Sequence, residues 1–220
     1  MQTMSPVNTV SPLLSSAPFT LWVTIPYTIF LVILVPVYWV YLGPQNFLWA
    51  CDIALFMTLY ALWRRSALVA SMAVLVTLMP DILWVADYVA RAVSGSDFLG
   101  IGATAYMFEK SVPFFVRALS FFHFFLAPLL VWMIYHIGYD VRALRWQTGV
   151  AWIVLPVSYF FTDPVRNINW VHGFAGIPPA WMPPVVFVLL IMLAVPVLIF
   201  WPTHWLMQRL FFGANTFKRA

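Results

Sequence analysis

Six apolar segments, separated by shorter polar stretches, make up most of the chain. A helix needs roughly 20 mostly apolar residues to cross the hydrocarbon core of a bilayer. The apolar segments lie at about 19–42, 46–63, 66–90, 112–138, 146–162 and 184–206. The pattern predicts an all-α protein, a polytopic membrane bundle of about six transmembrane helices. We expect residues 19–206 to form this single domain, between a short polar N-terminus at 1–18 and a basic C-terminal tail at 207–220.

Several of these segments contain proline. Membrane helices tolerate proline because neighbouring groups can satisfy the backbone carbonyls that it frees. The ring nevertheless removes one helical hydrogen bond and crowds the preceding turn, which bends the helix axis. We therefore expect kinks near Pro26, Pro36, Pro128 and Pro196.

The composition strengthens the membrane interpretation. Hydrophobic residues make up 64% of the 220 positions and charged residues 8%, whereas a soluble domain carries about 25% charged residues. Membrane lipids are therefore the expected partners, and the oligomeric state is left open. Nucleic acid is not an expected partner, because basic residues form no stripe outside the loops and the C-terminus. Residues 1–18 lack the basic residues of a signal peptide, so we expect the first apolar segment to be retained as a span.

The placement of Lys and Arg predicts the orientation, because cytoplasmic loops of membrane proteins are enriched in both. With six spans, one side carries Arg64, Arg65, Arg142, Arg145, Arg209, Lys218 and Arg219. The other side carries Arg91, Lys110, Arg117 and Arg166. This bias of seven to four predicts a multi-pass protein of the cell membrane with both termini in the cytoplasm.

Ionisable side chains inside apolar segments gather in the half of the bundle away from the cytoplasm. Such groups are costly in hydrocarbon and mark functional sites by default. The segments direct Cys51, Asp52, Asp81, Asp87, Arg117 and His123 to this outer half, and the loop after the fifth segment adds Asn167, Asn169 and His172. Four separate segments therefore predict one polar pocket in the outer half.

The residue types in this pocket suit nucleophilic chemistry. A thiol becomes a nucleophile when a base lies within hydrogen-bond reach, and Cys51 and His123 lie at compatible depths. Asp81 or Asp87 could orient the imidazole, completing a Cys–His–Asp arrangement. We expect these four residues to be catalytic, in a lipid-directed hydrolase or acyltransferase. The expected substrate-binding residues are Asp52, Arg117, Asn167, Asn169 and His172.

Two other interpretations use the same residues. In a non-enzymatic membrane protein, such as a transporter or a lipid-binding or partner-binding subunit, Asp52, Asp81, Asp87 and Arg117 would line a pathway or tie helices together as ion pairs. A zinc site built from His123, His172 and an Asp is a weaker alternative, because the sequence contains no HExxH pair. We therefore predict no metal and no cofactor.

Three strings carry a resemblance to known proteins. LWACDIALF, RALSFFHFFLAPLL and NINWVHG, in that order, resemble an uncharacterised family of bacterial six-span membrane proteins. More distantly, the chain is similar to the YwaF-type integral membrane proteins and, in layout, to androgen-induced-gene-type hydrolases and a phospholipid acyltransferase. The resemblance implies a nucleophile at Cys51, a base at His123 and an Asn-containing loop at Asn169.

Overall fold

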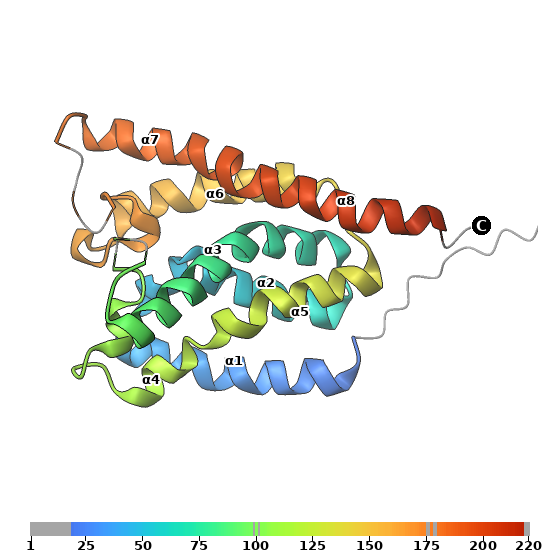
Figure 1. Cartoon of the computed structure of the whole chain (residues 1–220), viewed down its shortest axis with the longest axis horizontal. Coiled ribbons are helices and arrows are strands. Elements are labelled where there is room, and N and C mark those ends of the chain that lie inside the picture. Colours follow the sequence, from blue (N-terminus) through green and yellow to red (C-terminus); the bar gives the residue numbers. More distant parts are fainter. Residues whose placement is uncertain (1–18, 99, 101, 175–176, 178–179, 218–220) are drawn as a thin grey trace, which may run out of the picture.

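The computed structural model describes residues 19–98, 100, 102–174, 177 and 180–217, which form a bundle of helices (Figure 1). The α-helices are α1 (Leu21–Leu42), α2 (Ala50–Arg64), α3 (Ala67–Ser94), α4 (Phe114–Leu119), α5 (Phe122–Ile137), α6 (Ala143–Phe161), α7 (Pro184–Val195) and α8 (Trp201–Phe217). Shorter elements are η1 (Pro44–Leu48), η2 (Ala105–Phe108), η3 (Pro164–Arg166), η4 (Ile168–Trp170) and the π-helical segment η5 (Pro196–Phe200). The expected N-terminus at 1–18, with Lys218 and Arg219, lies outside the described residues.

The all-α class is confirmed for the described residues, which contain no β-strand. Four helical stretches are long and apolar enough to cross a membrane, namely Leu21–Leu42, Ala67–Ser94, Phe114–Ile137 and Pro184–Phe211. Helices also fill the second and fifth apolar segments, as α2 and α6. α2 has 15 residues, so it spans about 22 Å, less than the hydrocarbon thickness of about 30 Å. The count of six spans stays a prediction.

α3 lies at the centre of the bundle. α2, α5, α6 and α8 all pack against it, and its N-terminal half presents Ala70, Ser71 and Ala73, which are fully buried. Small side chains let helix backbones approach closely, which is how helices associate where lipid removes the hydrophobic driving force. Among the four helical stretches long enough to cross a membrane, α3 has the largest buried share, and it also carries Asp81 and Asp87.

The ends of α3 follow from local sequence. The side chain of Ser66 accepts a hydrogen bond from the Val69 N–H at 3.3 Å, which caps the first turn. At the other end, Gly95 adopts a left-handed conformation (φ 70°), and its N–H donates to the carbonyl of Arg91 at 2.9 Å. These two caps set the 28-residue length of the central helix.

The fourth and sixth apolar segments are not regular helices. The fourth breaks into α4 and α5 at Ser120 and Phe121, where short-range bonds such as Ser120 N–H to the Arg117 carbonyl tighten the turn. In the sixth, a π-helical turn begins at Pro196. Elsewhere α1 continues through Pro26 and Pro36 and α5 continues through Pro128, so the kinks expected at the prolines stay predictions.

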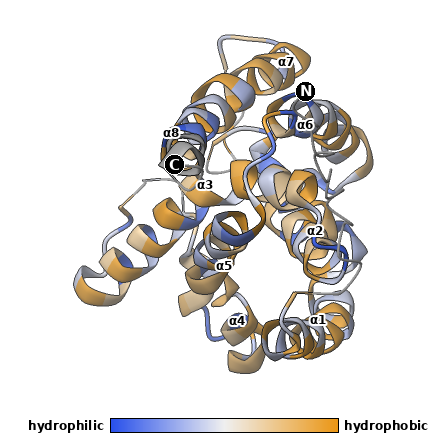
Figure 2. Cartoon of the chain, turned by 90° about the vertical axis from the view of Figure 1, so that its right-hand side faces the viewer, coloured by the Kyte–Doolittle hydropathy of each residue, from blue (hydrophilic) through white to orange (hydrophobic). Residues whose placement is uncertain are grey.

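The outward-facing surface of the bundle is apolar. Large hydrophobic side chains on every long helix are exposed, such as Trp22 at 90% and Val40 at 75%. Figure 2 shows hydrophobic colouring over the outer sides of the helices, α1 and α7 included. Exposed apolar surface of this extent needs an apolar environment to cover it, which is the physical basis for treating the chain as a membrane protein.

The connections separate cleanly between the two ends of the bundle. The described residues of segments 43–49, 95–113 and 162–183 lie at one end, on the left of Figure 1. The turns at 65–66 and 138–142 lie at the other end, with the start of α1 and the end of α8. The first group of connections carries most of the expected site residues that are not within helices.

Candidate functional site

The expected site residues fall into three places in the structure. One group lies inside the bundle, one fastens the connection at 95–113 to the helices, and one lies in the connection at 162–183. The group inside the bundle consists of Cys51, Asp52, Asp81 and His123. Asp87 and Arg117 fasten the connection at 95–113, and Asn167, Asn169 and His172 lie in the connection at 162–183.

Asp52 lies in the first turn of α2 and is 3% exposed. Its Oδ2 accepts a hydrogen bond of 2.9 Å from the side-chain amide of Asn46 in η1. Its Oδ1 is buried without a hydrogen-bond partner among the described residues. A helix N-terminus favours negative charge, so this carboxyl is partly supported and has one free oxygen.

Asp81 lies in the middle of α3 and is 1% exposed. Neither of its carboxyl oxygens has a hydrogen-bond partner among the described residues. The carboxyl lies toward the Ala127 backbone of α5 and within electrostatic range of the Tyr27 hydroxyl. That hydroxyl donates to the Leu55 carbonyl at 3.0 Å, so it is already committed elsewhere.

Cys51 precedes Asp52 in α2 and is partly buried. Its sulfur lies within electrostatic range of Asp52 and Asp81 together, and it also interacts with Tyr38 and Tyr106. The structure therefore brings together three of the expected residues, Cys51, Asp52 and Asp81, from two helices.

Two tyrosines that were not predicted as site residues, Tyr38 and Tyr106, also lie in this group. The hydroxyl of Tyr38 in α1 forms a 2.8 Å hydrogen bond with the side chain of Ser120, at the break between α4 and α5. Tyr106 in η2 interacts with the same serine and with Trp84, and desolvation by burial raises its pKa. Tyr38 could have been predicted as a site residue, because it is a polar aromatic residue inside an apolar segment. The sequence around Tyr106 contains no feature that would have identified it as one.

His123 is buried at the start of α5, among aromatic rings. Its ring stacks on Trp84 at 4.3 Å and 9°, and on Phe122 at 4.0 Å and 21°. Its Nδ1 donates to the Ser120 carbonyl at 2.7 Å, which leaves Nε2 as the acceptor nitrogen. Among the described residues no hydrogen bond joins His123 to Cys51, so the predicted pair stays a prediction.

Asp87 fastens the connection at 95–113 to α3. Its carboxylate accepts hydrogen bonds from the side-chain hydroxyl of Thr104 at 2.6 Å and from its N–H at 3.2 Å. One turn further along α3, Arg91 forms an ion pair of 2.9 Å with Asp97. Asp97 in turn accepts bonds from loop backbone N–H groups, so this carboxylate network holds the loop.

Arg117 also holds this connection. Its guanidinium donates to the Met107 carbonyl at 2.6 Å and lies 5.9 Å from the centre of the Phe114 ring. Ion pairs between helices were one expected role for the intramembrane charges. The two ion pairs found among the described residues, Arg91–Asp97 and Arg142–Asp140, include neither Asp81 nor Arg117.

Asn169 connects three parts of the molecule. Its Oδ1 accepts a bond of 2.9 Å from the Ala50 N–H at the start of α2. Its Nδ2 donates to the Leu48 carbonyl at 2.8 Å and to the Ser158 hydroxyl of α6 at 3.0 Å. The residue has φ 56°, a left-handed conformation that Asn tolerates better than most residues.

Asn167 and His172 shape the loop around Asn169. Asn167 also has a positive φ, donates to the Gly173 carbonyl at 2.6 Å and accepts a bond from the His172 N–H at 2.9 Å. The His172 ring stacks on Tyr159 at 5.0 Å, and its buried Nε2 has no hydrogen-bond partner among the described residues. Desolvation by burial lowers the pKa of His172, which favours the neutral ring.

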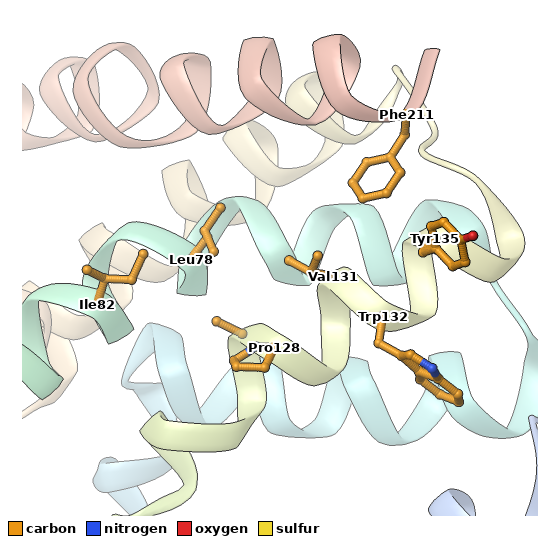
Figure 3. A pocket seen from close by; sticks show the side chains of 8 residues that line it. Leu78, Ile82, Pro128, Val131, Trp132, Tyr135 and Phe211 are labelled. Carbon is orange, nitrogen blue, oxygen red and sulfur yellow. The ribbon is translucent and has the colours of Figure 1, made fainter. Parts of the chain in front are cut away.

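A groove of about 540 Å³ contains none of these residues in its lining, although its lining residue Ala127 is the one toward whose backbone the Asp81 carboxyl lies. It opens between α3, α5 and α8, and Figure 3 shows its apolar side chains. The lining residues are Leu78, Ile82, Ala127, Pro128, Val131, Trp132, Tyr135 and Phe211. Its apolar character fits a surface that membrane lipid covers.

A metal site finds no support in the described part of the chain. No group of three or more His, Cys, Asp or Glu side chains there is arranged to hold a metal ion. His123 stacks between rings of α3 and α5, while His172 stacks on α6. The zinc alternative that combined the two histidines is therefore disfavoured.

Comparison with known proteins adds no relative. The chain matches no protein-family model, no curated protein and no solved structure. The resemblance carried by the three sequence strings stays a prediction.

Proposed function

We propose that this chain is a six-span integral membrane protein whose buried carboxyls form a binding site, so that it acts as a transporter or a membrane-embedded binding subunit. Asp81 carries this proposal. Its carboxyl is 1% exposed on the most central helix and has no hydrogen-bond partner among the described residues. A buried polar group without a partner costs stability, so its presence fits a functional requirement better than a structural one.

Six spans with cytoplasmic termini fit the arrangement of the helices. The six apolar segments alternate in direction, so that the start of α1 and the end of α8 lie at the same end of the bundle (Figure 1). Basic residues at 64–65, 142, 145 and 209 belong to that end. The excess of Lys and Arg there supports its assignment to the cytoplasm, which puts Asp52 near the outer surface of the cell membrane.

A lipid-directed hydrolase or acyltransferase that uses Cys51 and His123 is the second candidate. The bond from Nδ1 to Ser120 favours it, since Nε2 is then free to accept a proton. Two observations weigh against it: the described contacts of His123 are to Ser120 and aromatic rings, and a thiolate at Cys51 would face Asp52 and Asp81.

The binding-site proposal is tested by comparing two buried aspartates on the same helix. We expect Asp87→Ala to lower the free energy of unfolding by about 1–3 kcal/mol, because the Thr104 N–H and hydroxyl lose their acceptor. We expect Asp81→Ala to change it by less than about 1 kcal/mol, because losing an unpartnered carboxyl offsets the small cavity. Denaturant unfolding of both purified variants in the same detergent measures the difference.

The two aspartates serve as controls for each other, since both substitutions shorten a buried side chain of α3 to the same extent. A loss for Asp81→Ala as large as that for Asp87→Ala would mean that Asp81 holds the fold together. That result would overturn the proposal that its carboxyl is kept for binding.

A further inference from the structure

Asp81 lies near the middle of the central helix α3. It is the fifteenth of the 28 residues of α3, so at 1.5 Å per residue it lies about 20 Å from either end of the helix. Asp52, in contrast, lies in the first turn of α2, at the end of the bundle that carries the longer connections. The two buried carboxyls therefore differ in depth, and Cys51 lies within electrostatic range of both.

Two buried hydroxyls of α1 and α2 already donate to backbone carbonyls. From α1, the Tyr27 hydroxyl donates to the Leu55 carbonyl. From α2, the Thr58 hydroxyl donates to the Ala54 carbonyl at 2.7 Å. Neither of these two hydroxyls is therefore free to donate a hydrogen bond to Asp81.

Among the described residues, no ion pair includes Asp81. Tyr27 from α1 and Cys51 from α2 lie within electrostatic range of Asp81, and the Ala127 backbone of α5 lies toward it. The nearby basic side chains Arg91 and Arg117 are bound to the outer loop. An ionised carboxylate in this environment would cost several kcal/mol, since among the described residues it has no partner charge and only the Ala127 backbone lies toward it.

Protonation neutralises the carboxylate and so removes the cost of burying its charge, and a bound proton needs no cavity. We propose that Asp81 is a proton-binding site at the centre of the bundle, and that Asp52 is a second proton-binding group nearer the outer surface. In this step a carboxylate oxygen forms one O–H bond with a proton delivered by hydronium, whose own O–H bond breaks to leave water; no electrons are transferred. The inference rests on the proposed function and names the ligand of the same site.

A metal cation or an organic ammonium ion fits the site less well. An alkali or alkaline-earth cation needs about six oxygen ligands, and the described residues contain no group of three or more His, Cys, Asp or Glu side chains that could hold a metal ion. An ammonium ligand needs a cavity, and the groove described above is apolar and open to the outside of the bundle. A proton is the one cation that a close-packed, unpartnered carboxyl can bind.

Infrared spectroscopy tests the proposal on the full-length protein in lipid nanodiscs, titrated from acidic to basic pH in H₂O and D₂O. A protonated carboxylic acid has a C=O stretching band that ionised carboxylates lack and that shifts in D₂O. We expect wild type to show this band at neutral pH. Asp81→Asn should lose one component of the band and Asp52→Asn another, whereas Asp97→Asn should leave it unchanged, because Asp97 is ion-paired with Arg91.

Asp81→Glu serves as a second variant in case Asp81→Asn does not fold. It keeps a carboxyl at the position, so the component should persist at a shifted frequency. Absence of the band from wild type, or an identical band in wild type and both Asp81 variants, would overturn the proton assignment. The infrared result and the unfolding comparison can fail independently. If Asp81→Ala leaves the stability unchanged and wild type lacks the carboxylic acid band, the binding-site proposal stands but the ligand is not a proton.

Discussion

Buried polar side chains in this protein divide into those with partners and those without. Asp87, Arg117 and Asn169 each bond to a connecting segment, so they account for how the loops are held. Asp81 and one oxygen of Asp52 have no partner among the described residues. The first kind stabilises the fold and the second costs stability, which is why the second kind points to function.

Cys51 provides a prediction at this scale. In membranes treated with an activity-based probe for serine and cysteine hydrolases, we expect wild type and Cys51→Ala to be labelled equally. The reason is that a thiolate at this position would lie beside Asp52 and Asp81. Labelling of wild type that disappears in both Cys51→Ala and His123→Ala would instead establish the hydrolase candidate.

The elements are held together at one end by hydrogen bonds between segments far apart in the chain. η1 and the start of α2 meet η4 and α6 through Asn169, and α3 meets the following loop through Asp87. At the opposite end the turn between α5 and α6 is short, and its Asp140 forms an ion pair with Arg142. The side-chain hydrogen bond from Arg142 lowers the pKa of Asp140.

Asn169 therefore has a measurable role in joining elements. We expect Asn169→Ala to lower the free energy of unfolding by about 1–3 kcal/mol, because the Ala50 N–H, the Leu48 carbonyl and the Ser158 hydroxyl lose a common partner. Asn169→Asp keeps an acceptor for Ala50 and loses the donor, so it should fall between Ala and wild type. Denaturant unfolding in detergent measures this order. Equal stability of all three proteins would contradict the contribution of these bonds.

The whole molecule is a helix bundle with an apolar outer surface and distinct ends. Four helical stretches satisfy the length and hydropathy of membrane spans, and α2 and α6 fill the remaining apolar segments. The six-span proposal makes the connection at 162–183 external and the turn at 138–142 cytoplasmic.

Cysteine labelling checks this topology, since Cys51 is the single native cysteine. In a Cys51→Ser background, we expect Val165→Cys to react with a membrane-impermeant maleimide in intact cells. Val141→Cys should react only after permeabilisation. Val165 and Val141 are both exposed in the structure, so each serves as the other's control for accessibility. Reaction of both cysteines from the same side would contradict a span between them at α6.

The local pattern of residues was sufficient for the all-α class and for the approximate positions of the long helices. The helix of the first apolar segment was expected at 19–42 and spans Leu21–Leu42, because an apolar run in lipid must satisfy its backbone within itself. The break at Ser120 and the π-helical turn after Pro196 could not be read from hydropathy, which averages over a whole span.

The sequence by itself determined an all-α membrane-type chain with ionisable groups inside its apolar segments, because hydropathy and charge act locally along the chain. Only the tertiary structure decided which of these groups meet. It directed Asp87 to Thr104, Arg117 to Met107 and Asn169 to Ala50, and it left Asp81 without a partner among the described residues. Those outcomes depend on how each helix is rotated about its axis and how each loop returns, and neither is encoded in the periodicity of one segment.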